Sequence, residues 1–341
     1  MRVNKIASIA TSALLLMSSM SAHAEPEKVI KVSTWGSPNH GINKVVWPTW
    51  GQWIEEATEG RVTLKVEYDL APPHTQIDVV TDGIGEVTWI FHGHKAGRFK
   101  LTQLPEIPTF AEGSSSELMS MAYWRTYEKY LKKGREHRGV EVMGLSVHGP
   151  GQLITKEPVH ALSDIEGKKI RVGGGVISTM AKDMKVTPVF IPTNKVYESL
   201  SQGVVEGAYL PFEALSSFRL AEVADNTLVI PGGLYRGSFA IIMNRDTFAD
   251  LSKKDQEAIR SVSGEKLSRL FGQMWDEADQ SAYQEALQGG HTFTPATPEM
   301  ITQLKQASEP LVEDWYKVAE KRKVNGPEAY QFFNQQLAKG M

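Results

Sequence analysis

The stretch Val29-Ile30-Lys31-Val32-Ser33-Thr34-Trp35 reads as a strand and opens a regular succession of strands and helices. A helical spacing of apolar residues follows over 42–58, and apolar and polar residues alternate over 61–68. Residues 75–82 then predict a short helix, and residues 87–91 predict a buried strand. This order is that of β–α–β units, in which parallel strands share one sheet beneath covering helices. The sequence therefore predicts an α/β fold.

The remainder of the chain predicts a second group of strands that begins after His148-Gly149-Pro150-Gly151. The chain is then expected to return toward the first group, so that more than one connection joins two sheets with a cleft between them. No internal repeat or low-complexity segment interrupts this pattern. Strands are expected at 140–147, 169–172, 187–191, 205–210, 227–230 and 238–243, and helices at 117–133 (capped within 114–116), 177–185, 195–202, 255–287 and 298–320.

The amino terminus has the pattern of a secretory signal peptide. Arg2 and Lys5 precede an apolar run over 6–17, and Ala22-His23-Ala24 is a small-residue cleavage pattern. A membrane-anchoring helix is the alternative, but the run is shorter than the roughly 20 apolar residues that span a bilayer. We expect cleavage after Ala24, export of the chain, and no membrane span in the part that remains.

Composition excludes several classes of protein. The chain has no cysteine, so an exported form would carry neither disulfides nor thiolate metal sites. Its formal net charge is −3 with scattered charges, which is not the basic footprint of a nucleic-acid-binding protein. We therefore expect no nucleic-acid partner, and anion binding would require a local site.

Two segments of the second half resemble a known family of transport receptors. Residues 162–172 read Leu-Ser-Asp-Ile-Glu-Gly-Lys-Lys-Ile-Arg-Val, and after Pro192 residues 196–208 read Val-Tyr-Glu-Ser-Leu-Ser-Gln-Gly-Val-Val-Glu-Gly-Ala. This pattern is similar to that of the solute-binding proteins of tripartite ATP-independent periplasmic (TRAP) transporters, of the dicarboxylate-receptor (DctP) family. Weaker matches extend the resemblance over residues 28–325.

The resemblance implies a two-lobed periplasmic binding protein with a mixed sheet in each lobe and a long helix, residues 255–287, straddling both. Lobe I would comprise residues 25–148 with 237–276, and lobe II residues 149–236 with 277–341. It further implies a periplasmic receptor that captures a small organic anion and delivers it to the small and large membrane subunits of the transporter. The arginine of the Lys-Ile-Arg-Val strand, Arg171, would bind the ligand's carboxylate.

The chemistry of Arg171 agrees with that role. The residue lies at the carboxyl end of a predicted strand, where ligands bind in open α/β sheets. A guanidinium offers paired donors that match a carboxylate or a sulfonate. The alternative is a surface arginine in a basic run with Lys168 and Lys169.

Several positions depart from the family's acid-binding members. Where many of them carry a second arginine, this chain has Gly151 followed by Gln152, and Lys195 replaces a glutamate. Aromatic residues stand where polar contacts are common, which favours a flat apolar slot and an aromatic carboxylate. Each aromatic residue has burial in the core as its alternative role. The expected lining comprises Trp35, Trp89, Phe91, Tyr209 and Tyr235, with Gln152 as a polar contact.

Three further side chains are candidates for contacts to the ligand. Arg236, in the returning segment, is a second possible anion anchor, or a solvated loop arginine. His92 and His148 follow predicted strands and face the same crevice, where they would donate to the ligand or serve as structural histidines.

Nothing in the sequence assembles a catalytic site. His92-Gly93-His94 resembles a metal pair but lacks further ligands on later strands, and Gly173-Gly174-Gly175 lacks phosphate-loop spacing. We therefore predict a protein that is not an enzyme and has neither metal nor cofactor. The alternatives are a periplasmic α/β hydrolase-type enzyme, a sulfonate-binding receptor of the same fold, and a receptor that signals to a sensor partner.

Overall fold

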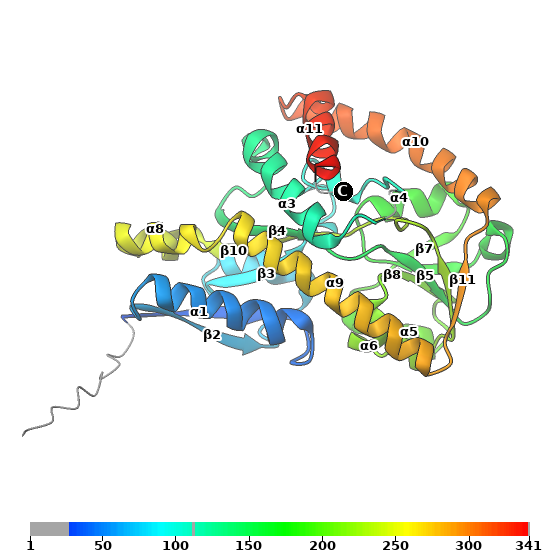
Figure 1. The fold of residues 1–341 in the computed structure, drawn as a ribbon, viewed down its shortest axis with the longest axis horizontal. Helices are drawn as coiled ribbons and strands as arrows, with labels where there is room; N and C mark the ends of the chain where they lie inside the picture. The colour runs from blue at the N-terminus through cyan, green and yellow to red at the C-terminus, as the bar shows by residue number, and fades with distance from the viewer. Residues whose placement is uncertain (1–26, 111–112, 340–341) are drawn as a thin grey trace, which may run out of the picture.

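The computed structural model describes residues 27–110 and 113–339, which form two β-sheets with helices packed on their faces (Figure 1). The predicted signal peptide, residues 1–24, and its cleavage site lie outside the described residues. Among the helices that are described, none is both long enough and apolar enough to cross a membrane.

The first sheet, sheet A, is mixed and has the strand order β2-β1-β3-β10-β4. β1 pairs in parallel with β2 and β3, whereas β10 runs antiparallel between β3 and β4. A strand from late in the chain therefore completes the sheet that the first part of the chain builds. The strands are β1 (Lys28–Thr34), β2 (Val62–Tyr68), β3 (Val87–Phe91), β4 (Val140–Val147) and β10 (Ser238–Asn244).

The second sheet, sheet B, is also mixed and has the order β11-β9-β5-β8-β6-β7. β6 pairs in parallel with β7 and β8, and β5 runs antiparallel to β8 and β9. The parallel part follows from the strand–helix alternation, because a parallel pair needs a crossover connection. The strands are β5 (Gln152–Thr155), β6 (Lys169–Val172), β7 (Thr187–Phe190), β8 (Gly207–Leu210), β9 (Asn226–Val229) and β11 (Thr292–Pro295).

The long helix that crosses from one sheet to the other begins later than the sequence predicts. Instead of one helix over 255–287, the structure has α8 (Lys253–Ser261) and α9 (Glu265–Gln288). Gly264 separates them with a φ of +64°, a conformation that favours glycine. Its N–H donates to the carbonyl oxygen of Met143 in β4 at 2.6 Å. The break therefore ties α9 to sheet A, and Figure 1 shows the helix running from there to sheet B.

The other helices cover the sheets and join their edges. Ser115 caps α3 (Ser116–Thr126) by accepting from the N–H of Leu118 at 3.0 Å, as the serine run predicts. The predicted helix over 117–133 is α-helical only to Thr126 and continues as π-helical and 3₁₀ turns. The remaining helices are α1 (Trp47–Ala57), α2 (Gln76–Thr81), α4 (Val176–Asp183), α5 (Val196–Ser201), α6 (Glu213–Ser217), α7 (Arg245–Asp250), α10 (Pro298–Lys321) and α11 (Gly326–Ala338).

Five of the strands and α-helices in the described residues have no counterpart in the sequence prediction: β5, β11, α6, α7 and α11. Four of them have only four to six residues, too few to display a period of 2 or 3.6 clearly. The thirteen-residue α11 did carry a start signal, because Asn325 caps it and Pro327 lies in its first turn.

Candidate ligand-binding site

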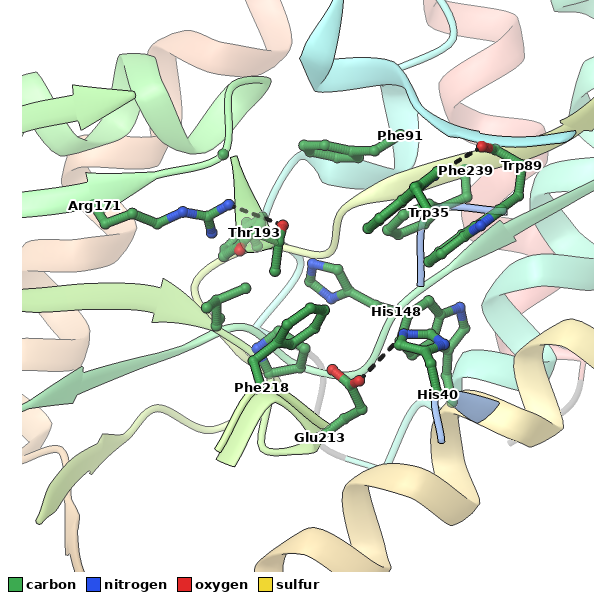
Figure 2. Close-up of a pocket in the computed structure, with 15 residues that line it drawn as sticks. Trp35, His40, Trp89, Phe91, His148, Arg171, Thr193, Glu213, Phe218 and Phe239 are labelled. Carbon is green, nitrogen blue, oxygen red and sulfur yellow. Dashed lines mark hydrogen bonds and ion pairs between the residues drawn. The ribbon is translucent and has the colours of Figure 1, made fainter. Parts of the chain in front are cut away.

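A cavity lies between the ends of the two sheets, with about 440 Å³ of empty space when the open solvent at its mouth is included (Figure 2). Several of its lining residues lie at or just beyond the carboxyl ends of β1, β3, β4, β6 and β8, which is where open α/β sheets bind ligands. The returning strand β10 and helices α6 and α9 complete the wall. The lining residues are Trp35, His40, Trp89, Phe91, His148, Arg171, Gly173, Thr193, Leu210, Pro211, Glu213, Phe218, Tyr235, Phe239 and Trp275.

Stacked aromatic rings form the sheet A side of the cavity. The rings of Trp35 and Trp89 are parallel within 4°, with centroids 3.8 Å apart, and Phe239 stacks on Trp89 at 5.6 Å. The Trp35 indole N–H donates to the carbonyl oxygen of Trp89 at 3.0 Å, which holds its ring flat against the second indole. Phe91 extends the wall with its ring centroid 5.2 Å from that of Phe239. Such a wall matches the flat face of an aromatic ligand.

Arg171 is the cationic group of the sheet B side, and its side chain is only 2% exposed. Its Nε–H donates to the carbonyl oxygen of Ile191 at 2.9 Å, and Nη1 donates to that of Tyr209 at 3.3 Å. Nη2 donates to the hydroxyl of Thr193 at 3.1 Å. A guanidinium has five N–H donors, so one remains on each terminal nitrogen. A carboxylate or sulfonate that enters the cavity can accept from these donors.

No acidic side chain among the described residues forms an ion pair with Arg171. Burial lowers the pKa of its guanidinium to about 10, so the group still carries its charge at neutral pH. A buried charge without a counter-ion is costly, and a bound anion would supply the missing charge. Gly173 keeps the approach open, because a Cβ there would lie 3.0 Å from Nη2 of Arg171 and 3.3 Å from the ring of Phe91.

His40 and Glu213 lie at the opposite side of the cavity from Arg171, as Figure 2 shows. The His40 Nε2 and Glu213 Oε1 atoms are 3.3 Å apart, but their alignment is not that of a hydrogen bond. Burial lowers the pKa of His40 to about 3 and raises the pKa of Glu213 to about 7. Because both shifts disfavour charge, the histidine is neutral at pH 7, and this is not a conventional ion pair.

His148 lines the cavity, but its hydrogen bonds are already committed to the backbone. Its Nδ1 lies 2.6 Å from the carbonyl oxygen of Gly149, and its Nε2 accepts from the N–H of Gly237 at 2.9 Å. The ring is therefore the neutral Nδ1–H tautomer, in keeping with a pKa lowered to about 3 by burial. It offers the ligand a ring face rather than a donor.

Six of the ten candidate contact residues line the cavity: Trp35, Trp89, Phe91, His148, Arg171 and Tyr235. Tyr235 also explains the missing second arginine, because its ring packs against Gly151 where any side chain would collide with it. Its hydroxyl donates to the carbonyl oxygen of Tyr209 at 3.0 Å.

The other four predicted residues bind elsewhere in the protein. His92 contacts His137 through Nε2 at 2.9 Å and Ser238 through Nδ1 at 3.0 Å. The Gln152 amide is paired with the backbone of Ile230, accepting at 2.7 Å and donating at 3.3 Å.

Tyr209 and Arg236 also turn away from the cavity. Tyr209 reaches the site only through its carbonyl oxygen, since its buried side chain packs in the core. The Arg236 guanidinium donates to the carbonyl oxygen of Ser114 at 2.5 Å and to the hydroxyl of Ser116 at 3.2 Å. It thus anchors the segment before α3, and it is neither an anion anchor in the cavity nor a solvated arginine.

Several lining residues were not among the predicted contacts, and most had no signal in the sequence. No predicted strand end indicated four of them. His40 lies in a loop, Glu213 and Phe218 lie in and just after the short helix α6, and Trp275 lies in α9. Two others had a local signal: Thr193 follows Pro192 in the segment that resembles the transport receptors, and Gly173 directly follows the predicted strand that carries Arg171.

The likeness to known proteins agrees with this geometry. Residues 32–318 match the family model of bacterial extracellular solute-binding protein, family 7. A relative from Comamonas testosteroni, named outer membrane transporter protein TsaT, is 30% identical over 336 residues, 97% of each chain.

Two solved structures share the fold. A TRAP periplasmic solute-binding protein from Bordetella bronchiseptica with bound (R)- and (S)-mandelate is 36% identical, with a TM-score of 0.88 over 92% of this chain and 99% of that one. A TRAP solute-binding protein of a marine metagenome, specific for aromatic acid ligands and in complex with metahydroxyphenylacetate, is 27% identical, with a TM-score of 0.83 over 91% of this chain and 98% of that one. The chain therefore belongs to family 7 of the bacterial extracellular solute-binding proteins, which confirms its two-lobed α/β fold and its resemblance to the receptors of TRAP transporters.

Proposed function

We propose that this protein is a periplasmic receptor that captures a small aromatic carboxylate in the cavity and presents it to the small and large membrane subunits of a TRAP transporter. The observation that carries the proposal is the buried guanidinium of Arg171, which has free donors and no acidic partner among the described residues. An anion that enters the cavity completes this site.

The aromatic wall would pack against the ring of the ligand, while the guanidinium of Arg171 would bind its carboxylate. Trp35, Trp89, Phe91 and Phe239 offer flat apolar surface, so a ring seated there leaves water without losing hydrogen bonds. Two related receptors are described with mandelate and with metahydroxyphenylacetate, both aromatic acids. An aromatic sulfonate has the same charge and shape, and it is the alternative ligand class for the same cavity.

The proposal extends to export and to the motion of the protein. The signal peptide over residues 1–24 would direct the chain to the periplasm. Residues 25–148 with 237–276 and residues 149–236 with 277–341 would then close on the ligand as two lobes. The residues that we propose to contact the ligand all line the cavity: Trp35, Trp89, Phe91, Arg171 and Tyr235.

Isothermal titration calorimetry with benzoate, mandelate, benzenesulfonate and an aliphatic carboxylate tests the proposal. Arg171→Ala should weaken binding of the tightest of these at least about thirtyfold, because loss of a buried charged anchor costs about 2–5 kcal/mol. The matched control is Lys169→Ala, which removes an exposed positive charge from the same strand and should leave affinity within about twofold. Equal affinity of the Arg171→Ala and unmodified proteins would contradict the proposal.

We further propose that the protein releases its ligand unchanged. Among the described residues of the cavity wall, no hydroxyl is hydrogen-bonded to a general base, since the Thr193 hydroxyl accepts from Arg171 and the Tyr235 hydroxyl donates to the carbonyl oxygen of Tyr209. Incubation of stoichiometric protein and ligand followed by mass spectrometry should return only the starting acid. A new product would instead favour a hydrolase-type enzyme.

A further inference from the structure

The side of the cavity opposite Arg171 has polar atoms that the protein leaves unpaired. His40 is 1% exposed and Glu213 is 3% exposed, and both line the cavity. Among the described residues, neither Nε2 of His40 nor Oε1 of Glu213 has a hydrogen-bond partner. Buried polar groups in folded proteins are nearly always paired, so two unpaired atoms side by side in a ligand cavity indicate that a ligand pairs them.

The hydrogen-bonding role of His40 is determined by its backbone contact. Its Nδ1 accepts from the N–H of Ile42 at 3.1 Å, so this nitrogen carries no hydrogen. Burial without a strong counter-charge keeps the ring neutral, with a pKa of about 3. The single ring proton is therefore on Nε2, which makes that atom a donor that lies 3.3 Å from Oε1 of Glu213 without being aligned to donate to it.

Glu213 provides the complementary acceptor. Its backbone N–H is held by the carboxylate of Asp279 at 2.7 Å, which fixes the start of α6 and hence the position of the side chain. The hydroxyl of Ser217 also interacts with the carboxyl group and partly offsets the effect of burial on its pKa. Oε1 remains the oxygen without a partner, 3.3 Å from Nε2 of His40.

We infer that His40 and Glu213 form a subsite for a hydroxyl group on the ligand's ring, on the side away from its carboxylate. The hydroxyl oxygen accepts a hydrogen bond from Nε2–H of His40, and the hydroxyl group donates a hydrogen bond to Oε1 of Glu213. This inference rests on the proposed function, because Arg171 must hold the carboxylate at the other side of the cavity (Figure 2).

A hydroxyl fits this subsite better than the other common ring substituents. It is both a donor and an acceptor, so it satisfies both unpaired atoms at once. A methyl group or hydrogen satisfies neither, and sites built to bind a hydroxyl discriminate strongly against the analogue that lacks it. A second carboxylate would lie against the Glu213 carboxyl in a low-dielectric site, which disfavours dicarboxylates.

Calorimetric titration of the unmodified protein with benzoate, 3-hydroxybenzoate and 4-hydroxybenzoate tests the inference without any substitution. One hydroxybenzoate should bind at least about tenfold more tightly than benzoate. Two isomers are needed because the position of the hydroxyl on the ring decides whether it reaches the pair.

Two variants then assign the preference to the subsite. Glu213→Met keeps the length of the side chain but removes the acceptor. His40→Asn removes the Nε2–H donor and retains an acceptor near the N–H of Ile42. Each variant should reduce the preference for the hydroxybenzoate to within about threefold, while benzoate binding reports that the protein is folded.

The outcomes separate this inference from the proposed function. If benzoate binds and depends on Arg171, but the unmodified protein shows no preference for either hydroxybenzoate, the subsite is overturned and the receptor function stands. A preference that survives in both variants also overturns the subsite. If none of the acids in either titration binds, the proposed function fails and the subsite fails with it.

Discussion

Asp279 on α9 is a carboxyl group that the fold keeps in its neutral form. Its Oδ1 accepts from the N–H of Glu213 at 2.7 Å, while its Oδ2 has no partner among the described residues and packs against Gly149. Burial, with smaller contributions from the Glu213 and Asp276 carboxyl groups, raises its pKa to about 8 against the lowering effects of the Glu213 N–H and the Arg236 charge. The folded protein therefore binds this proton more tightly than the unfolded chain does.

The stability of the protein should consequently depend on pH through Asp279. The contribution is fully present below the unfolded pKa near 4 and is lost as pH rises toward the folded pKa of about 8. Asp279→Asn lacks this loss, because its amide oxygen still accepts from Glu213 and carries no charge. We therefore compare the free energy of unfolding of the Asp279→Asn variant with that of the unmodified protein. The variant's value relative to the unmodified protein should rise by about 1–3 kcal/mol from pH 5 to pH 8, since one pKa unit is worth about 1.4 kcal/mol.

Chemical denaturation of both proteins at pH 5 and pH 8 measures this difference. The buried histidines, with pKa values lowered to about 3, and Glu106, with a pKa of about 7, are common to both proteins and largely cancel. A difference that stays constant across this range would mean that Asp279 is already ionised in the folded protein.

At the scale of elements, the crossing of α9 over the start of α3 holds the frame on which the site is built. Asp276 on α9 accepts from the backbone N–H groups of Ser116 at 2.7 Å and Glu117 at 3.0 Å, so one helix caps another. Gly272, one turn earlier, brings the two backbones into contact, because a Cβ there would lie 2.5 Å from the Cα of Glu117. This close approach also positions Trp275, which lines the cavity.

Gly272→Ala should therefore destabilise the protein even though alanine is the better helix former. The added methyl must push apart the backbones of α9 and α3, and such overpacking costs about 1–3 kcal/mol. The matched control is Gly51→Ala in α1, where the nearest atoms to the new Cβ would be those of the Leu64 side chain, at an ordinary contact distance of 3.6 Å or more. That substitution should be neutral or stabilise by up to about 1 kcal/mol. Thermal denaturation compares the two, and equal melting temperatures would contradict the predicted backbone contact.

At the scale of the whole molecule, the buried Glu106 joins the two sheets beside the cavity. Its Oε2 accepts from the N–H of Val176, the first residue of α4 after β6 of sheet B, at 2.9 Å. Its Oε1 accepts from the hydroxyl of Ser238 at the start of β10 in sheet A, at 2.6 Å. Gly174 touches the carbonyl group of Gly93 in the same region, where a Cβ would collide. These contacts exist only while the sheets lie as close as they do in this structure.

Removing the Glu106 contact should weaken ligand binding, because this contact holds together the two sheets that form the cavity. Glu106 does not itself line the cavity. Glu106→Ala leaves the N–H of Val176 and the hydroxyl of Ser238 without their acceptor, and a hydrogen bond contributes about 1 kcal/mol. We expect benzoate, or the tightest acid of the screen, to bind about five- to tenfold more weakly. Glu106→Gln retains an acceptor for Val176 and a polar partner for Ser238, so its affinity should stay within about twofold. The idea is wrong if calorimetry finds equal affinities for Glu106→Ala and Glu106→Gln.

Local pattern was sufficient for much of the fold and for one residue of the site. The predicted bounds of β3, β4 and β6 agree with the structure, because each is a run of strand-forming residues between turn signals. The same run places Arg171 at a strand end. The apolar spacing of α8 continues into α9, so periodicity alone predicts one helix over both. The structure breaks this helix at Gly264.

The sequence by itself determined the α/β alternation, the membership of the receptor family and the position of Arg171, because these follow from periodicity and from residues adjacent in the chain. Only the tertiary structure decided the rest of the site. It turned Arg236 and His92 toward other protein groups, and it brought His40 beside Glu213. Hydrogen-bond partners and burial depend on which distant segments meet, and burial in turn determines which groups remain charged. No local pattern carries that information.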